Sequence, residues 1–223
     1  MHVLDTIHIP GDFLRGRRGF AAEITSTDRW RWLLAIILIF GPLYGLSMGS
    51  FSATEPARGW LAVYSATKVP LLLGATTLLC LPGYFVLNTV LGLRDDFRAA
   101  LQAILAGQAA LSIALASLAP LTLVWYASDV SYRAALLFNA GAFLIATLAG
   151  QAVMLRYYRP LIARDTRHRL GLAAWLGLYA FVGIQMGWML RPFIGAPGEP
   201  PQFFRPEPFS NAYVVVARLL TGS

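Results

Sequence analysis

The chain has 223 residues, of which 57% are hydrophobic and only 13% are charged. Soluble domains carry about 25% charged residues, so the composition excludes an ordinary soluble globular domain. The net charge of +7 comes from 17 arginines and a single lysine. Because the arginines flank apolar segments, we interpret them as topology signals and as contacts for anionic headgroups. Membrane lipids are therefore the expected partners, and nucleic acid is not.

The first 30 residues predict a cytoplasmic segment that precedes the membrane domain. Pro10 and Gly11 interrupt it, and its acidic residues leave no continuous apolar core, so we expect no cleavable signal peptide. Leu14, Phe20 and Ile24 lie near arginines, which is typical of a segment that rests on a membrane surface. An unstructured tail is the alternative interpretation.

Five apolar stretches follow and predict a membrane domain over residues 31–193. A bilayer core of about 30 Å needs roughly 20 apolar residues in helical conformation. We expect transmembrane helices over residues 32–51, 60–93, 97–126, 132–157 and 170–190. In the long second helix, Pro70 and Pro82 predict kinks, because proline removes a backbone donor. The expected fold is an all-α bundle of five transmembrane helices.

Residues 194–223 predict a proline-rich tail that cannot form a long helix. The apolar segment over residues 211–220 is too short to span, so we expect it to lie on the membrane or on a partner. Four aromatic residues of the tail suit docking on a partner surface: Phe203, Phe204, Phe209 and Tyr213.

Basic residues are distributed unequally over the two sides that five spans define. Five arginines precede the first span, two lie between the second and third, and five lie between the fourth and fifth. Only five lie on the other side. Since positive charge remains cytoplasmic, we expect the N-terminus inside and the tail outside. The prediction is a multi-pass protein of the bacterial inner membrane with a periplasmic tail.

Glycines recur at four-residue spacing in two of the expected helices. Gly41, Gly45 and Gly49 share one face of the first, and Gly183 and Gly187 share one face of the fifth. Small residues at this spacing allow another helix to approach closely in lipid. The face serves either contact between helices of this chain or docking to another subunit.

Lys68 is the only basic residue well inside an expected span, and no acidic residue lies inside any span. Charges at such depth pair, face a cavity or extend to the interface. Ser117, Asn139 and Gln185 fall at similar depth, so they could converge with Lys68 on a polar pocket for an anion or a lipid headgroup. Extension of the lysine to the interface and amide contacts between helices are the alternatives.

Several chemistries are disfavoured. The histidines His2, His8 and His168 lie outside the expected spans, which argues against haem held by paired histidines. No cluster has metal-ligand spacing, and Cys80 reads as a small buried residue. A nucleophile pair of Lys68 with Ser47 or Ser117 is conceivable, although nothing specifies it. We therefore expect no cofactor, no metal and no enzymatic activity.

Three segments carry a resemblance to known sequences: KVPLLLGATTLLCLPGYFVLN (68–88), SLAP (117–120) and WMLRPFIGAPGEPPQFFR (188–205). They resemble stretches shared by uncharacterised bacterial multi-span proteins of the inner membrane. Residues 60–213 are also loosely similar to the Yip family, which has a cytoplasmic N-terminus and five clustered spans. The Yip signature DLYGP is absent, and GPLYG (41–45) is only superficially alike. The resemblance implies no activity and no binding residues.

The leading hypothesis is a non-enzymatic accessory or scaffolding subunit of a larger membrane protein complex. It rests on the glycine faces, on the lack of catalytic residues in the spans, and on the aromatic tail. The alternative is a small transporter or lipid-handling protein that uses a polar pocket around Lys68, because interrupted helices near polar residues are typical of transport sites.

Overall fold

The computed structural model describes residues 26–51, 59–128, 130–195 and 200–204. Every regular element in these ranges is helical, and five helices are long and apolar enough to cross a membrane. A bilayer core offers no water to backbone N–H and C=O groups, so apolar stretches of this length satisfy them within a helix. The prediction of five such helices is confirmed. Residues 1–25 and the tail residues Phe209 and Tyr213 lie outside the described ranges.

The helices are α3 (Ser26–Gly49), α4 (Gly59–Val90), α5 (Phe97–Ala127), α6 (Tyr132–Arg164) and α7 (His168–Met189), with a short 3₁₀ turn, η2 (Arg94–Asp96), before α5. α4 is one continuous helix that contains Pro70 and Pro82. α6 continues through Pro160, past the end predicted at residue 157. A proline lacks a backbone N–H group, so the helix loses one hydrogen bond there. The residues around Pro160 are good helix formers and keep the arginine-rich last turns helical.

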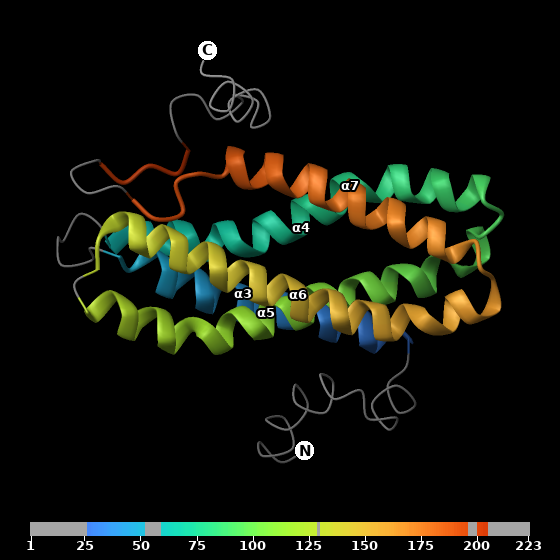
Figure 1. Cartoon of the computed structure of the whole chain (residues 1–223), viewed down its shortest axis with the longest axis horizontal. Helices are drawn as coiled ribbons and strands as arrows, with labels where there is room; N and C mark the ends of the chain where they lie inside the picture. Colours follow the sequence, from blue (N-terminus) through green and yellow to red (C-terminus); the bar gives the residue numbers. More distant parts are fainter. Residues whose placement is uncertain (1–25, 52–58, 129, 196–199, 205–223) are drawn as a thin grey trace, which may run out of the picture.

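The helices pack in an order that differs from their order in the chain (Figure 1). α6 packs against α5, α5 against α3, α3 against α4, and α4 against α7. The enclosed face of α5 is built largely from small side chains: Ala100, Ala103, Ala106, Ala109 and Ala110. Small residues allow neighbouring helices to approach closely, which explains how α5 sits among the others.

The alternating helices give the bundle two ends (Figure 1). The Lys68 end holds the end of α3, the start of α4, the end of α5 and the start of α6. The His168 end holds the loop from α4 to α5 and the loop from α6 to α7. α7 stops short of the Lys68 end, and the chain continues from it across that end. We call residues 191–195 and 200–204 the strap.

Two glycines bring α3 into backbone contact with α4. A Cβ atom added at Gly45 would lie 2.6 Å from the Cα atom of Ala66, and one added at Gly49 would lie 2.6 Å from the Cα atom of Ala62. Real Cβ atoms do not approach other atoms this closely, so neither position accepts a side chain unless a helix moves. This part of the glycine face therefore packs within the chain.

The other predicted packing glycines are less crowded. A Cβ atom at Gly41 would lie 3.5 Å from Pro70, and one at Gly183 would lie 3.6 Å from the Thr76 methyl group. Nothing lies within 4 Å of the same point at Gly187. At these positions an alanine would fit without displacement of a neighbour.

A second glycine contact, between α5 and α6, was not predicted from the sequence. A Cβ atom at Gly107 would lie 2.8 Å from the Cβ atom of Met154, and one at Gly150 would lie 2.7 Å from the carbonyl oxygen of Gly107. Each helix contributes one glycine here, so no four-residue spacing within either helix reveals the contact.

Candidate functional site

Lys68 lies on α4 with 0% of its surface exposed. Its Nζ atom donates to the carbonyl oxygen of Pro192 over 2.6 Å. The same atom lies 4.8 Å from the ring centroid of Phe203 and 5.9 Å from that of Phe193. Aromatic faces attract a cation and a carbonyl accepts from it, so the strap solvates the ammonium group. No ion pair among the described residues involves Lys68.

Three successive carbonyl groups of the strap accept hydrogen bonds from helix side chains. Lys68 donates to Pro192, the Ser65 hydroxyl donates to Phe193, and the Tyr132 hydroxyl donates to Ile194 over 3.4 Å. A non-helical segment must find partners for its backbone groups outside itself. Side chains of α4 and α6 thus hold the strap across the Lys68 end.

Asn139 forms a second polar contact at this end, among α3, α5 and α6. Its Oδ1 atom accepts from the Tyr44 hydroxyl over 2.8 Å. Its Nδ2 atom donates to the Tyr126 hydroxyl over 2.6 Å and to the Ala135 carbonyl over 2.7 Å. The Tyr126 hydroxyl donates in turn to the Met48 carbonyl over 3.3 Å. Asn139 therefore joins three helices through buried hydrogen bonds.

The four residues expected to form a polar pocket take different positions. Lys68 contacts the Pro192 carbonyl, and Asn139 lines a pocket of about 280 Å³ that the strap residue Pro192 also lines. Ser117 is exposed on α5, and its hydroxyl donates within that helix to the carbonyl of Ile113. Gln185 is half-buried on α7. The structure thus brings Lys68 and Asn139 to the same strap and leaves Ser117 on the bundle surface.

The described aromatic residues of the tail pack on the chain itself. The Phe203 ring lies 5.5 Å from the Tyr64 ring of α4, centroid to centroid, and 4.8 Å from the Phe204 ring. Phe204 is 47% exposed. Of this pair, Phe204 presents the larger surface to other molecules.

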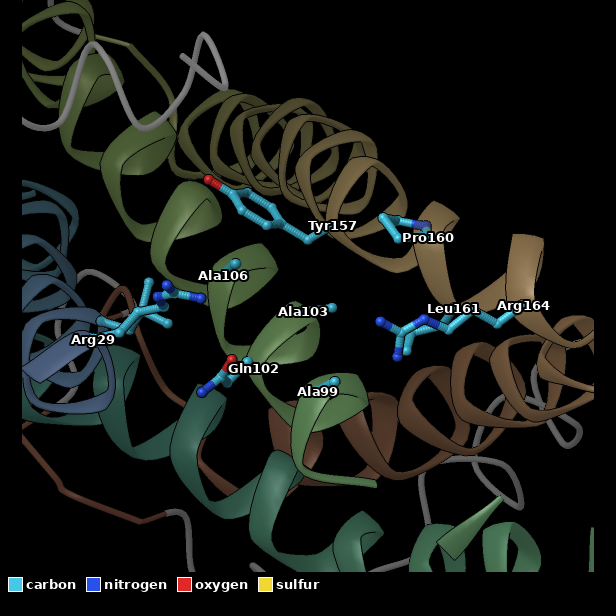
Figure 2. Close-up of a pocket in the computed structure, with 10 residues that line it drawn as sticks. Arg29, Ala99, Gln102, Ala103, Ala106, Tyr157, Pro160, Leu161 and Arg164 are labelled. Carbon is cyan, nitrogen blue, oxygen red and sulfur yellow. The ribbon is translucent and has the colours of Figure 1, made fainter. Parts of the chain in front are cut away.

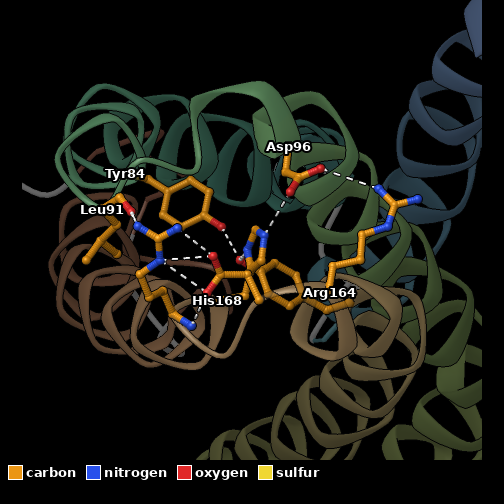
Figure 3. Close-up of polar contacts among 8 residues, drawn as sticks. Tyr84, Leu91, Asp96, Arg164 and His168 are labelled. Carbon is orange, nitrogen blue, oxygen red and sulfur yellow. Dashed lines mark hydrogen bonds and ion pairs between the residues drawn. The ribbon is translucent and has the colours of Figure 1, made fainter.

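At the opposite end, a chain of polar contacts is centred on His168 (Figure 3). His168 is 0% exposed. Its Nε2 atom lies 3.2 Å from Oδ2 of Asp96, and its Nδ1 atom lies 3.4 Å from the Tyr158 hydroxyl. That hydroxyl lies 2.7 Å from the hydroxyl of Tyr84. At the surface, Asp96 faces Arg164 at 3.5 Å. The contacts join α4, η2, α6 and α7.

Sequence analysis did not identify this cluster. His168 was placed outside the fifth span, which we expected to begin at residue 170, whereas the residue begins α7 and is buried. The available signal was Tyr84 inside an expected span and Tyr158 directly after another, since a buried phenol hydroxyl requires a partner. Nothing in the sequence indicated that His168 would meet the Tyr158 hydroxyl group, or that Asp96, from a separate connection between helices, would meet His168.

The two loops of the His168 end are also joined through Arg167. Its Nη1 atom donates to the Leu91 carbonyl over 2.7 Å, and its Nη2 atom donates to Oδ2 of Asp165 over 2.6 Å. These charge-assisted bonds lower the pKa of the partly exposed Asp165 carboxyl to about 2. Arg167 therefore connects the loop between α6 and α7 to the end of α4.

Several reactive side chains of the described residues are fully buried. Lys68, Cys80, Tyr158 and His168 each have 0% exposure, and the polar contacts of Lys68, Tyr158 and His168 lead to other groups of the chain. The part of the chain that the structure describes also holds no group of three or more His, Cys, Asp or Glu side chains that could bind a metal ion. These residues form internal contacts rather than the lining of an open cleft.

Comparison with known proteins finds no matching family model, no matching curated protein and no matching solved structure. The function must therefore be inferred from the geometry of the chain itself.

Proposed function

We propose that this chain is a non-enzymatic multi-pass protein of the bacterial inner membrane that serves as an accessory or scaffolding subunit of a larger membrane assembly. Its N-terminus lies in the cytoplasm and the strap lies on the other side, in agreement with the asymmetry of the arginines. The observation that carries the proposal is the composition of the outward face of α7.

Four residues of α7 at helical spacing face away from the bundle: Ala173, Gly177, Ala180 and Ile184. α7 packs chiefly against α4. Its inner side also contacts α5, because the Tyr179 hydroxyl donates to Oε1 of Gln108 over 3.0 Å. The inner side of α7 thus holds the helix in place, while the three small residues lie in a row at the surface, beside the exposed Leu170, Phe181 and Ile184.

The outward faces of α4 and α6 lack such a row of three small residues at helical spacing. They expose large aliphatic side chains such as Leu78 and Val86 on α4 and Leu144 and Leu148 on α6. Lipid chains contact such residues as well as they contact alanine or glycine. Small residues on an exposed helix face bring a specific advantage only when a second helix approaches closely. We therefore infer that the partner contributes a transmembrane helix, which packs on α7 near Gly177.

Co-purification tests the proposal. The tagged full chain is extracted from native membranes with a mild detergent, and the co-migrating proteins are identified by native electrophoresis and mass spectrometry. The variants are Gly177→Leu and the matched control Gly141→Leu. Both glycines have open space where a Cβ atom would lie, but Gly141 is on α6. We expect a fixed set of subunits with the wild type and the control, and its loss with Gly177→Leu.

Two results would contradict the proposal. A chain that migrates alone in every preparation would argue against an accessory role. A partner that is retained equally by both variants would argue against the α7 face.

Flux of a substrate into liposomes that contain only this protein would instead favour the alternative, transport at Lys68. That alternative requires the strap to leave Lys68, because Pro192 and Phe203 now cover its ammonium group.

A further inference from the structure

A pocket of about 210 Å³ opens at the His168 end between α3, α5 and α6. Its polar lining comes from Arg29 on α3, Gln102 on α5, and Tyr157 and Arg164 on α6. Figure 2 shows the guanidinium groups of Arg29 and Arg164 directed toward each other across the pocket, with Ala103 of α5 between them. Alanines on α5 leave the space that a larger side chain would fill.

The described residues that line this pocket include two arginines and no acidic residue, so they carry a positive charge. Asp96 pairs with Arg164 at 3.5 Å, but the same carboxylate also faces His168 at 3.2 Å. The Arg164 side chain remains 72% exposed, so its guanidinium group stays accessible to a ligand. Two guanidinium groups around one space favour an anion with several oxygen atoms, because each can donate two parallel hydrogen bonds.

The position of the pocket matches the headgroup level of a membrane. It lies beside the first turns of α3, where Trp30 and Trp32 occur, and tryptophan favours the interface between lipid and water. Apolar side chains also line the pocket, among them Leu33, Ala106 and Leu161. A lipid with its headgroup at the arginines would therefore find apolar side chains beside it.

We propose that Arg29 and Arg164 bind a phosphate group in this pocket, and that an anionic glycerophospholipid presents it. Gln102 offers an additional amide donor at the same site. Basic pockets between transmembrane helices recognise anionic headgroups by this chemistry. The site is independent of the α7 face, because it lies between α3, α5 and α6.

Lipid binding to the full chain in detergent tests the site. Native mass spectrometry would titrate the protein with phosphatidylglycerol and phosphatidylethanolamine, and thermal unfolding would be measured with each lipid and with inorganic phosphate. The test variant is Arg29→Gln/Arg164→Gln. The control is Arg98→Gln/Arg169→Gln. It removes two exposed arginines that lie at the same end of the bundle but do not line the pocket. Ala99→Leu fills the pocket edge while both arginines remain.

We expect the wild type and the control to bind phosphatidylglycerol at least about tenfold more tightly than the test variant, since each charge-assisted contact contributes more than a neutral one. Ala99→Leu should also weaken phosphatidylglycerol binding, although this variant keeps the charge of the wild type. Stabilisation by inorganic phosphate without a preference for phosphatidylglycerol would support the phosphate site and assign it to a soluble ligand. Equal phosphatidylglycerol binding by the test and control variants would overturn the proposal, because the effect would then reflect overall charge.

Discussion

At the Lys68 end, side chains hold the strap through its backbone carbonyl groups, whereas at the His168 end side chains bond mainly to one another. Lys68, Ser65 and Tyr132 donate to three consecutive carbonyls of the strap. His168 instead lies between the side chains of Asp96 and Tyr158. Both ends thus bury a basic residue, but among the described residues only His168 has a carboxylate partner.

The difference follows from how far each basic residue lies from the end of its helix. Lys68 lies nine residues from the start of α4, where a second charge would be costly in lipid, so a carbonyl and aromatic rings satisfy the ammonium group. His168 and Asp96 lie at the ends of helices, close to water, where a carboxylate is tolerated. An interior cation can therefore be stabilised without a counter-ion when a segment of the same chain folds over it.

The largest effect is expected where backbones touch, at the Lys68 end. Gly45→Ala places a methyl group 2.6 Å from the Cα atom of Ala66, so α3 and α4 must separate. Overpacking costs about 1–3 kcal/mol. Gly141→Ala meets nothing within 4 Å and should be neutral or gain up to about 1 kcal/mol from helix propensity. Thermal unfolding in one detergent measures both, and equal stabilities would show that the close contact contributes nothing.

The next effect tests the side-chain contacts at the His168 end. Tyr158→Phe removes the hydroxyl that contacts both Tyr84 and His168, and a buried polar group left without a partner costs about 1–3 kcal/mol. Tyr132→Phe, which removes one long contact to the strap, should cost less.

A double-mutant cycle sharpens the same prediction. Tyr84→Phe and Tyr158→Phe remove the two ends of one hydrogen bond, so their combined loss should fall short of the sum by about 1 kcal/mol. Strictly additive losses in the free energy of unfolding would show that the two hydroxyl groups do not depend on each other.

More of the Lys68 end than of the His168 end could be predicted from the sequence, for a physical reason. A lone lysine in an apolar stretch and glycines four residues apart are local patterns, so the helices and Gly45 and Gly49 could be predicted. The contacts of His168 join residues from four elements, and no local spacing encodes them. The strap was also not predicted, because its hydrogen bonds come from helix side chains rather than from a pattern of its own.

A smaller and more local effect is expected from Lys68→Met. Replacing a buried charge by an apolar side chain of similar length often leaves global stability nearly unchanged. The strap, however, loses its bond at Pro192 and its cation beside Phe203. Backbone amides of residues 193–195 should exchange hydrogen at least about tenfold faster, while those of α5 keep their rates. Ser65→Ala removes one neutral bond to the same strap and should accelerate exchange less. Equal rates in the two variants would mean that the charge does not hold the strap.

The smallest effect concerns the surface of the His168 end, where Asp165 accepts from Arg167. These bonds lower the pKa of Asp165 from its ordinary value of 3.8 to about 2. A carboxyl group with a lowered pKa in the folded state contributes stability above its unfolded pKa, and that contribution disappears as the pH falls through the folded pKa. The wild type should therefore unfold at a slightly higher temperature than Asp165→Asn above pH 4, and the difference should vanish as the pH falls below 2. Asp95→Asn, which removes an exposed carboxyl group of η2 at the same end, is the control for the loss of one charge. A difference that persists below pH 2 would show that Asp165 acts through its shape and not through its charge, because the protonated carboxyl and the amide then carry the same charge.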